Sequence, residues 1–303
     1  MTITETPRPT SAPGTRALDG GPRRDATSIV FVAALWACLT MAALFLIFIL
    51  LTIIVEGIAR FDLNLITGVP STIRPETAGV QPAIMGTLLV IAMTAGIALP
   101  LGIAAAIYLE EYADRARWYN RMIEVNIQNL AAVPSIIFGI LVLAFVVRSP
   151  LNVGAVALSG SIALALLILP VIIISTREAL RAVPGEIRDG SLAVGATQFQ
   201  TVWYQLLPAA VPGIATGSIL AISRAIGEAA PLILIGATTF ITFTPDGPLS
   251  RYTVMPVQIF NFAIQSREAF VPLTYASILL LIIILLAMNG LAIFLRNRFQ
   301  QRW

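Results

Sequence analysis

Two ionisable side chains interrupt a long apolar stretch in the last third of the chain. Arg224 and Glu228 lie four residues apart within residues 211–237, which otherwise carry no charge. This spacing places both side chains on one face of a helix, where they can form an ion pair. A charge in the middle of a bilayer costs about 2.5 to 3.5 kcal/mol on insertion scales, so such residues face protein or water and mark a pathway. A guanidinium also keeps donors that a single carboxylate cannot engage, and its planar fork suits an oxyanion. The pair is therefore a candidate anion site.

The simpler interpretation is an ion pair that only fixes helix packing or bridges to another subunit. Gly227 and Pro231 flank the pair and permit a kink that would open backbone groups toward a path. Ser135, which follows Pro134 in another apolar stretch, is a third candidate for lining this path. A serine bonded to its own backbone beside a proline kink is the ordinary alternative for that residue.

The chain contains no lysine and no histidine, so all 19 of its basic residues are arginines. Without lysine there is no G-x-x-x-x-G-K-[ST] phosphate loop and no Schiff-base chemistry. Without histidine there is no Ser-His-Asp triad and no H-E-x-x-H zinc site. The single Cys38 cannot form an internal disulfide. We therefore expect no enzymatic activity, no metal site and no cofactor bound by this chain.

The composition predicts an all-α, polytopic membrane protein. Of its residues 57% are hydrophobic and 12% are charged, against about 25% charged in soluble domains. A helix that crosses a bilayer needs about 20 apolar residues. Five stretches without an ionisable side chain reach this length: 26–55, 77–109, 125–147, 149–176 and 269–295. With residues 211–237, six transmembrane helices are expected.

Arginine placement predicts the orientation of these spans, because basic residues near span ends stay in the cytoplasm. Thirteen arginines fall on the side that holds both termini, five fall on the other side, and Arg224 lies within a span. Both termini are therefore expected in the cytoplasm. The expected organisation is a disordered cytoplasmic tail over 1–28, a first transmembrane helix over 29–58, a core of five transmembrane helices over 80–296, and a cytoplasmic C-terminus over 297–303.

A polar loop over residues 177–205 carries two helix breaks. Pro184 ends the helix that leaves the fourth span, because proline lacks the amide hydrogen and clashes with the preceding turn. A short helix over about 186–194 then ends at Gly195, a residue that tolerates positive φ. Thr197, with a glutamine three positions later, matches a capping box for a further short helix. On physical grounds alone, an interfacial amphipathic loop without a partner explains this segment equally well.

The loop resembles the E-A-A-x3-G-x9-I-x-L-P loop of permeases in binding-protein-dependent ABC importers. The corresponding residues are Asp189, Gly190, Ser191, Gly195, Gln205, Leu206, Leu207 and Pro208. Asp replaces Glu, Gly and Ser replace the two alanines, and Gln replaces Ile. The likeness extends over residues 86–87, 100–113, 129–141, 180–197, 207–217, 224–231 and 255–263. Together these segments resemble the PstA-type permease of the phosphate ABC importer, although Ala229 stands where that family commonly has Thr.

The resemblance implies a type I ABC importer (MetI-like) permease fold and a non-catalytic subunit for inorganic phosphate in the bacterial inner membrane. It implies as partners a PstC-type permease, a homodimeric PstB-type ATPase that uses the ATP, and a PstS-type phosphate-binding protein, with membrane lipid around the chain and no nucleic acid. It also implies that the 177–205 loop couples to the ATPase. The coupling residues we expect are Glu186, Arg188, Asp189, Gly190, Ser191, Gly195, Ala196 and Thr197.

Three rival functions remain at this point. The substrate can be another oxyanion, such as sulfate or molybdate. The chain can be a secondary transporter or channel, although those often show inverted repeats with paired broken helices, and residues 177–208 have no second copy in the chain. It can also be a membrane sensor or scaffold that transports nothing.

Overall fold

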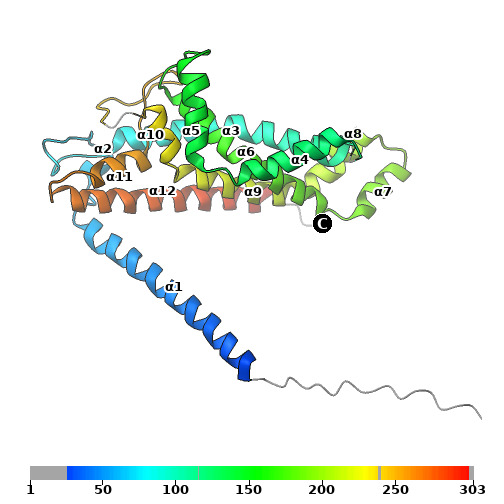
Figure 1. The fold of residues 1–303 in the computed structure, drawn as a ribbon, viewed down its shortest axis with the longest axis horizontal. Helices are drawn as coiled ribbons and strands as arrows, with labels where there is room; N and C mark the ends of the chain where they lie inside the picture. Colours follow the sequence, from blue (N-terminus) through cyan, green and yellow to red (C-terminus); the bar gives the residue numbers. More distant parts are fainter. Residues whose placement is uncertain (1–25, 115, 238–239, 300–303) are drawn as a thin grey trace, which may run out of the picture. The chain divides into compact units, whose positions relative to one another are not determined.

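The computed structural model describes residues 26–114, 116–237 and 240–299, and within these ranges every regular element is helical (Figure 1). The expected all-α class is confirmed. The chain divides into two compact units, residues 1–50 and residues 51–303. The helix α1 (Ala26–Ile58) begins at the end of the region expected to be a disordered tail, so residues 26–28 are helical. The remainder of that tail, residues 1–25, and the C-terminal residues 300–303 lie outside the described part.

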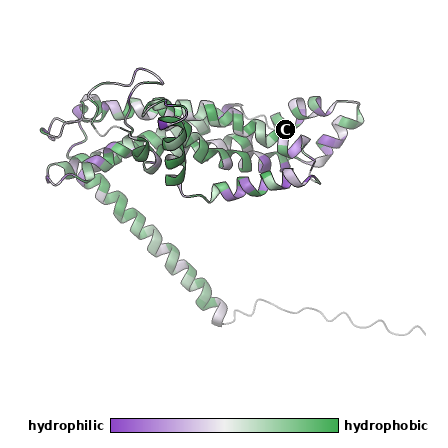
Figure 2. Cartoon of the chain, turned by 45° about the horizontal axis from the view of Figure 1, so that its top comes forward, coloured by the Kyte–Doolittle hydropathy of each residue, from purple (hydrophilic) through white to green (hydrophobic). Residues whose placement is uncertain are grey.

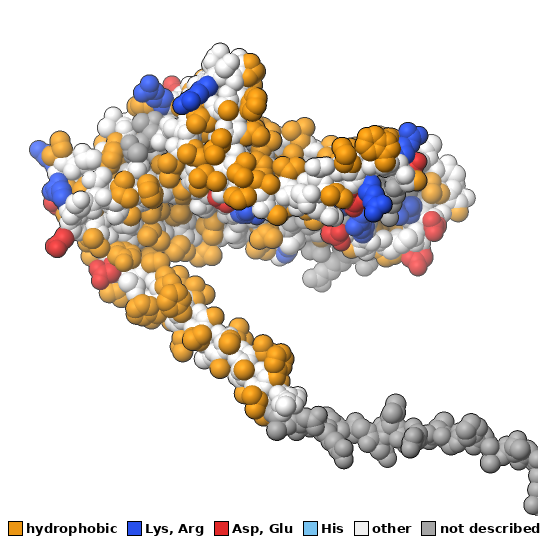
Figure 3. Space-filling view, viewed as in Figure 1, with side chains coloured by type: hydrophobic (Ala, Val, Ile, Leu, Met, Phe, Trp, Pro, Cys, Tyr) orange, Lys and Arg blue, Asp and Glu red, His pale blue; other side chains and the backbone are white. Residues whose placement is uncertain are grey.

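Five helices in the described residues are long and apolar enough to cross a membrane. They are α1, α3 (Gln81–Ile107) with its extension η1 (Tyr108–Tyr112), α6 (Ala157–Arg181), the continuous helix Gln198–Ile226, and α12 (Phe270–Phe299). A sixth span results if a bent pair of helices is counted as one. Figure 3 shows most of the charged side chains of the second unit toward its two ends, with a mostly apolar surface between them.

The third span differs from the straight helix expected over residues 125–147. It consists of α4 (Trp118–Ala131) and α5 (Ser135–Val142), which continues as η2 (Leu143–Arg148), and the two parts are bent by 106°. The break falls at Pro134, which has φ −56° and ψ 135°. Proline supplies no amide hydrogen, and its ring disfavours helical backbone at the residue before it. An apolar count cannot register such a break.

The fifth span also differs from the expected 211–237. The helix already begins with α8 (Gln198–Thr201) and runs through η3 (Val202–Leu206) into α9 (Leu207–Ile226). The short helix expected after Thr197 is therefore the first turn of the span itself. After Ile226 the helix breaks, and α10 (Ala230–Ile235) follows.

The helix α6 lies at the centre of the second unit, packed between α3 and α9. Small residues let these helices approach closely. A Cβ atom on Gly102 of α3 would lie 2.6 Å from a side-chain carbon of Ile172, and one on Gly217 of α9 would lie 2.3 Å from the hydroxyl of Ser175. Close packing of this kind is the main source of association between membrane helices. The three helices run side by side along the unit (Figure 1).

A second core lies at the end of the unit opposite to α7. It joins α2 (Leu63–Thr67), α11 (Met255–Ala263) and the first turns of α12, with Leu65, Phe262 and Phe270 fully buried. The Thr87 hydroxyl of α3 accepts a hydrogen bond from the backbone amide of Met255 at 2.9 Å. The apolar run that begins at Met255 is therefore mostly core.

Candidate functional site

The segment after α6 folds as the sequence predicts. The helix α7 (Gly185–Ala193) begins directly after Pro184. Gly195 has φ +90°, the left-handed conformation that allows a helix to end abruptly. Thr197 and Gln200 form both bonds of the capping box that starts α8. Figure 2 shows this end of the molecule as one of its most hydrophilic parts.

The expected coupling residues separate into two groups. Glu186, Asp189, Gly190, Gly195 and Thr197 are exposed, and a Cβ atom on either glycine would meet no other atom within 4 Å. The other three, Arg188, Ser191 and Ala196, are half-buried. The α7 helix has no fully buried residue, and Val194 just after it is 86% exposed. This segment therefore presents a free face for a partner.

The half-buried residues hold α7 to the rest of the unit. The Arg188 guanidinium forms an ion pair with Glu111 of η1, with 2.5 Å between Nη2 and Oε1. The hydroxyls of Ser191 and Thr201 lie 2.9 Å apart. Arg188 was expected to face the ATPase, and in this structure it is engaged within the chain.

A cluster of buried ion pairs, not anticipated from the sequence, joins three helices near α7. The Glu110 carboxylate binds Arg177 at 3.1 Å and Arg181 at 3.0 Å, and Arg177 also binds Glu124 of α4 at 2.8 Å. Glu110 is 3% exposed and Arg177 is 9% exposed. Charges this deeply buried need partners, because desolvation is costly. The signal that could have found the cluster is the Glu110-Glu111 pair directly after an apolar span.

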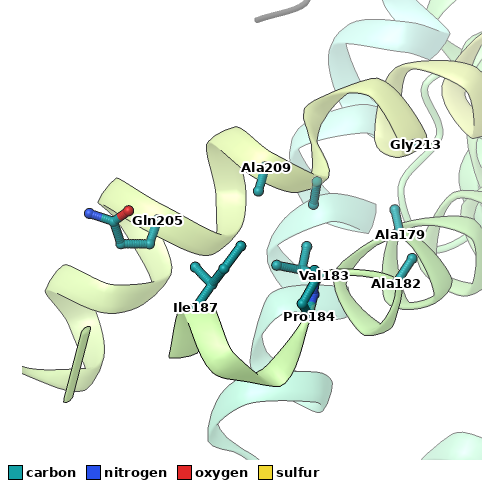
Figure 4. Close-up of a pocket in the computed structure, with 9 residues that line it drawn as sticks. Ala179, Ala182, Val183, Pro184, Ile187, Gln205, Ala209 and Gly213 are labelled. Atoms are coloured by element: carbon teal, nitrogen blue, oxygen red, sulfur yellow. The ribbon is translucent and has the colours of Figure 1, made fainter. Parts of the chain in front are cut away.

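An apolar cavity of about 550 Å³ lies between α6, α7 and α9 (Figure 4). Its lining includes Val183 and Pro184 between α6 and α7, Ile187 of α7, and Ala209 and Gly213 of α9. Ile187 is the residue by which α7 faces this space. The side of α7 that faces α6 and α9 is therefore apolar, and the space next to it is not filled by side chains.

Arg224 and Glu228 lie on either side of the break that ends α9. The distance between Arg224 Nε and Glu228 Oε1 is 3.7 Å, and the two side chains are 46% and 20% exposed. This ion pair is too long to be a hydrogen bond. Within the described residues the Arg224 guanidinium donates no hydrogen bond, so its fork is available. The last turn of α9 favours a cation there, because the helix dipole places partial negative charge at a C-terminus.

The second break, at Pro134, is brought next to the first. Helix α5 packs against α10, and a Cβ atom on Gly139 would lie 2.7 Å from the Cα atom of Pro231. Ser135 is half-buried in the first turn of α5. The fold thus places the N-terminal end of α5 in the same region as the end of α9 that carries Arg224. Irregular backbone at membrane depth is tolerated where it is buried in protein or lines a water-filled cavity, so the two breaks are compatible with a path for a polar substrate.

The family profile described as "Binding-protein-dependent transport system inner membrane component" matches residues 98–303. The chain belongs to this family. The matched range contains Ser135, the coupling segment, the Arg224 and Glu228 pair and the buried ion pairs around Glu110. This inner membrane component is therefore a multi-pass membrane protein.

Its relatives include proteins named phosphate transport system permease protein PstA. That of Yersinia pestis is 34% identical over 89% of this chain and 90% of its own length. That of Haemophilus influenzae is 30% identical over 90% of both chains. PstA 1 of Mycobacterium tuberculosis is 33% identical over 74% of this chain and 72% of its own length. The resemblance found in the sequence motifs is confirmed.

Solved structures of ABC importers share the fold. A chain of the MetNI methionine ABC transporter, in an inward-facing conformation, is 19% identical, with a TM-score of 0.56 over 73% of this chain and 97% of that one. A chain of a bacterial alginate ABC transporter, in complex with an alginate-bound periplasmic protein, is 14% identical, with a TM-score of 0.63 over 92% of this chain and 99% of that one. This inner membrane component therefore has the MetI-like, type I importer permease fold.

Proposed function

We propose that the chain is the transmembrane permease subunit of an ATP-driven importer for inorganic phosphate. The observation that carries this proposal is the identity of 30 to 34%, over about nine-tenths of the chain, to phosphate transport permeases. The guanidinium of Arg224, which pairs with Glu228 but donates no hydrogen bond in the described residues, supplies a matching anion site at two adjoining helix breaks. Membership in a family of binding-protein-dependent transport components argues against a channel or a transporter driven by an ion gradient.

The Arg224 and Glu228 pair would act as a relay for the anion. Arg224 offers donors to phosphate oxygens, while Glu228 keeps the site near neutral, so that the anion is not held too tightly to leave. Glu228 can also accept a hydrogen bond from a protonated phosphate oxygen. Sulfate carries no such proton at neutral pH, so the carboxylate would disfavour it. Ser135 adds a hydroxyl from the neighbouring break.

The partners of this permease would be those of a complete importer. A second permease would close the translocation path, a periplasmic binding protein would deliver phosphate, and a dimeric ATPase would dock on the exposed face of α7. Both termini and α7 would lie in the cytoplasm. The chain itself would bind no cofactor and hydrolyse no ATP, since it has no lysine for a phosphate loop and no histidine.

Docking on α7 would convert ATPase closure into movement of the spans. The helix lies between Pro184 and Gly195, so it can move as a rigid body with a bound partner. Its exposed residues Glu186 and Asp189 are available for contact with the ATPase.

The test is uptake of radiolabelled phosphate by cells that express the whole importer with Arg224→Gln. We expect uptake to fall at least tenfold while the ATPase still co-purifies, because the main anion donor in the path is lost. Arg251→Gln is the matched control, since Arg251 is an exposed arginine of the loop before α11 and should leave uptake unchanged. Uptake equal to that of the parent would contradict the relay, and competition by excess sulfate or molybdate would indicate another oxyanion.

A further inference from the structure

Two consecutive glutamates in the turn that continues α3 bind different parts of the molecule. Glu110 pairs with Arg177 and Arg181 of α6, whereas Glu111 pairs with Arg188 of α7. Both carboxylates are almost fully buried, at 3% and 5% exposure. They lie in η1, a π-helical turn, and such turns are often found at functional sites.

Glu111 contacts one residue that precedes Gly195 in the sequence and one that follows it. Its carboxylate binds Arg188 of α7, and its backbone carbonyl accepts a hydrogen bond from the Gln198 amide group of α8. Since α7 buries no residue completely, and an apolar cavity lies beneath it, few contacts anchor this helix. The ion pair between Arg188 and Glu111 is the charged contact that joins α7 to a transmembrane helix in the described residues.

The helix that carries Glu111 reaches the opposite end of the unit. From Gln81 to Ile107, α3 spans about 40 Å at 1.5 Å per residue. At its far end Gly86 packs directly on the Thr253 backbone, and Thr87 binds the first amide of α11. One helix therefore contacts both α7 and α11.

We propose that the ion pair between Arg188 and Glu111 is the link through which movement of α7 is transmitted along α3 to α11. Arg188 and Glu111 are positioning residues in this account, because neither contacts substrate. Glu110 fixes the same turn to α6, so α3 and α6 should move together when α7 moves. This inference rests on the proposed function, in which a partner ATPase moves α7. It assigns to Arg188 a role inside the permease, whereas the sequence placed this residue in the docking surface.

The test reconstitutes the complete importer in proteoliposomes and measures phosphate taken up per ATP hydrolysed. With Glu111→Gln or Arg188→Gln we expect this ratio to fall at least fivefold while ATP hydrolysis continues, because the ATPase still closes but α3 no longer follows. Arg188→Lys should largely restore the ratio, since the contact with Glu111 in the described residues is made by the single nitrogen Nη2 of Arg188. Glu178→Gln is the control, because it removes an exposed ion pair within α6 and should leave the ratio unchanged.

A second readout does not depend on the transported substrate. In a Cys38→Ser background, a cysteine introduced at Phe260 of α11, a half-exposed position, reports the far end of the link through its rate of maleimide labelling. ATP should change this rate at least threefold in the parent and leave it unchanged in Glu111→Gln.

The outcomes separate the two proposals. If the parent complex takes up no phosphate, but ATP alters labelling at residue 260 in the parent and not in Glu111→Gln, the proposed substrate is wrong and the link stands. If Glu111→Gln and Arg188→Gln keep both the parent ratio and the parent labelling response, the link is wrong and the proposed function stands. Should either single variant fail to assemble, the double variant Arg188→Gln with Glu111→Gln decides, because it breaks the ion pair and leaves no buried charge without a partner.

Discussion

At the residue scale, single glycines decide how closely the helices approach. Gly86 of α3 packs on a backbone carbonyl, and a Cβ atom there would lie 2.0 Å from the Thr253 oxygen. Backbone cannot move aside as a flexible side chain can. A methyl group at this position must therefore displace α3 or the irregular segment before α11. Gly96 of the same helix has no neighbour within 4 Å of such an atom. The two residues look alike in the sequence, and only the packing distinguishes them.

This difference gives a stability prediction. Gly86→Ala should destabilise the folded chain by about 1 to 3 kcal/mol, the usual cost of overpacking. Gly96→Ala should be neutral or should stabilise it by up to about 1 kcal/mol, because alanine is the better helix former. Thermal unfolding of the detergent-solubilised protein measures both. Equal melting temperatures for the two variants would contradict the close approach of α3 to Thr253.

At the element scale, the sequence predicted the helices better than their breaks. The tetrapeptide Ala-Val-Pro-Gly occurs at residues 182–185 and again at 210–213. The first copy ends α6, whereas the second continues through α9 without interruption. The second copy is packed on α6, with Gly213 against Ala179, while Gly185 of the first has no neighbour within 4 Å. Tertiary packing therefore decides which proline breaks a helix, and no local pattern could separate these cases.

The end of α7 was predictable from the sequence, because the left-handed conformation that ends the helix depends on a single residue type, glycine. Gly195→Val should abolish phosphate uptake and leave membrane insertion intact. A β-branched residue at φ +90° is strained, at a cost of about 1 to 2 kcal/mol or more, so the end of α7 must change direction. The control is Gly185→Ala, an equally open position at the start of α7 that has no positive φ and is not among the expected coupling residues. Uptake and the amount of chain in the membrane fraction are the measurements, and normal uptake by Gly195→Val would contradict a coupling role for this turn.

At the scale of the whole molecule, the spans and the class were predictable from composition, but the ion pairs that join them were not. Charge counting assigned Arg177 and Arg181 to orientation alone. The structure shows both on Glu110, more than 60 residues away along the chain. A pairing over that separation depends on how α3 and α6 meet, which neither periodicity nor composition encodes. The candidate site shows the same limit, because the Pro134 break and the Arg224 break meet only through the packing of α5 on α10.

The orientation predicted from arginine placement can be tested on the whole molecule. In a Cys38→Ser background, an impermeant maleimide added to intact spheroplasts should label a cysteine at Leu249, in the loop before α11, and should not label one at Val194, after α7. Both side chains are well exposed, at 68% and 86%, so a difference reports the side of the membrane and not burial. Permeabilised spheroplasts are the control and should label both. The reverse pattern would invert the proposed topology.

The bend at Pro134 also determines where water must go. The break leaves the first backbone amides of α5 without partners inside that helix, whereas the Asn129 and Leu130 carbonyls near the end of α4 accept hydrogen bonds from the amides of Ala132 and Val133. In hydrocarbon each such group costs several kcal/mol, so irregular backbone inside a membrane lines a hydrated space or is buried in protein. The amides of Ser135 and Ile136 should consequently exchange with deuterium far faster than those of the neighbouring turns. Water would then occupy the helix break at Pro134 whether or not substrate is bound.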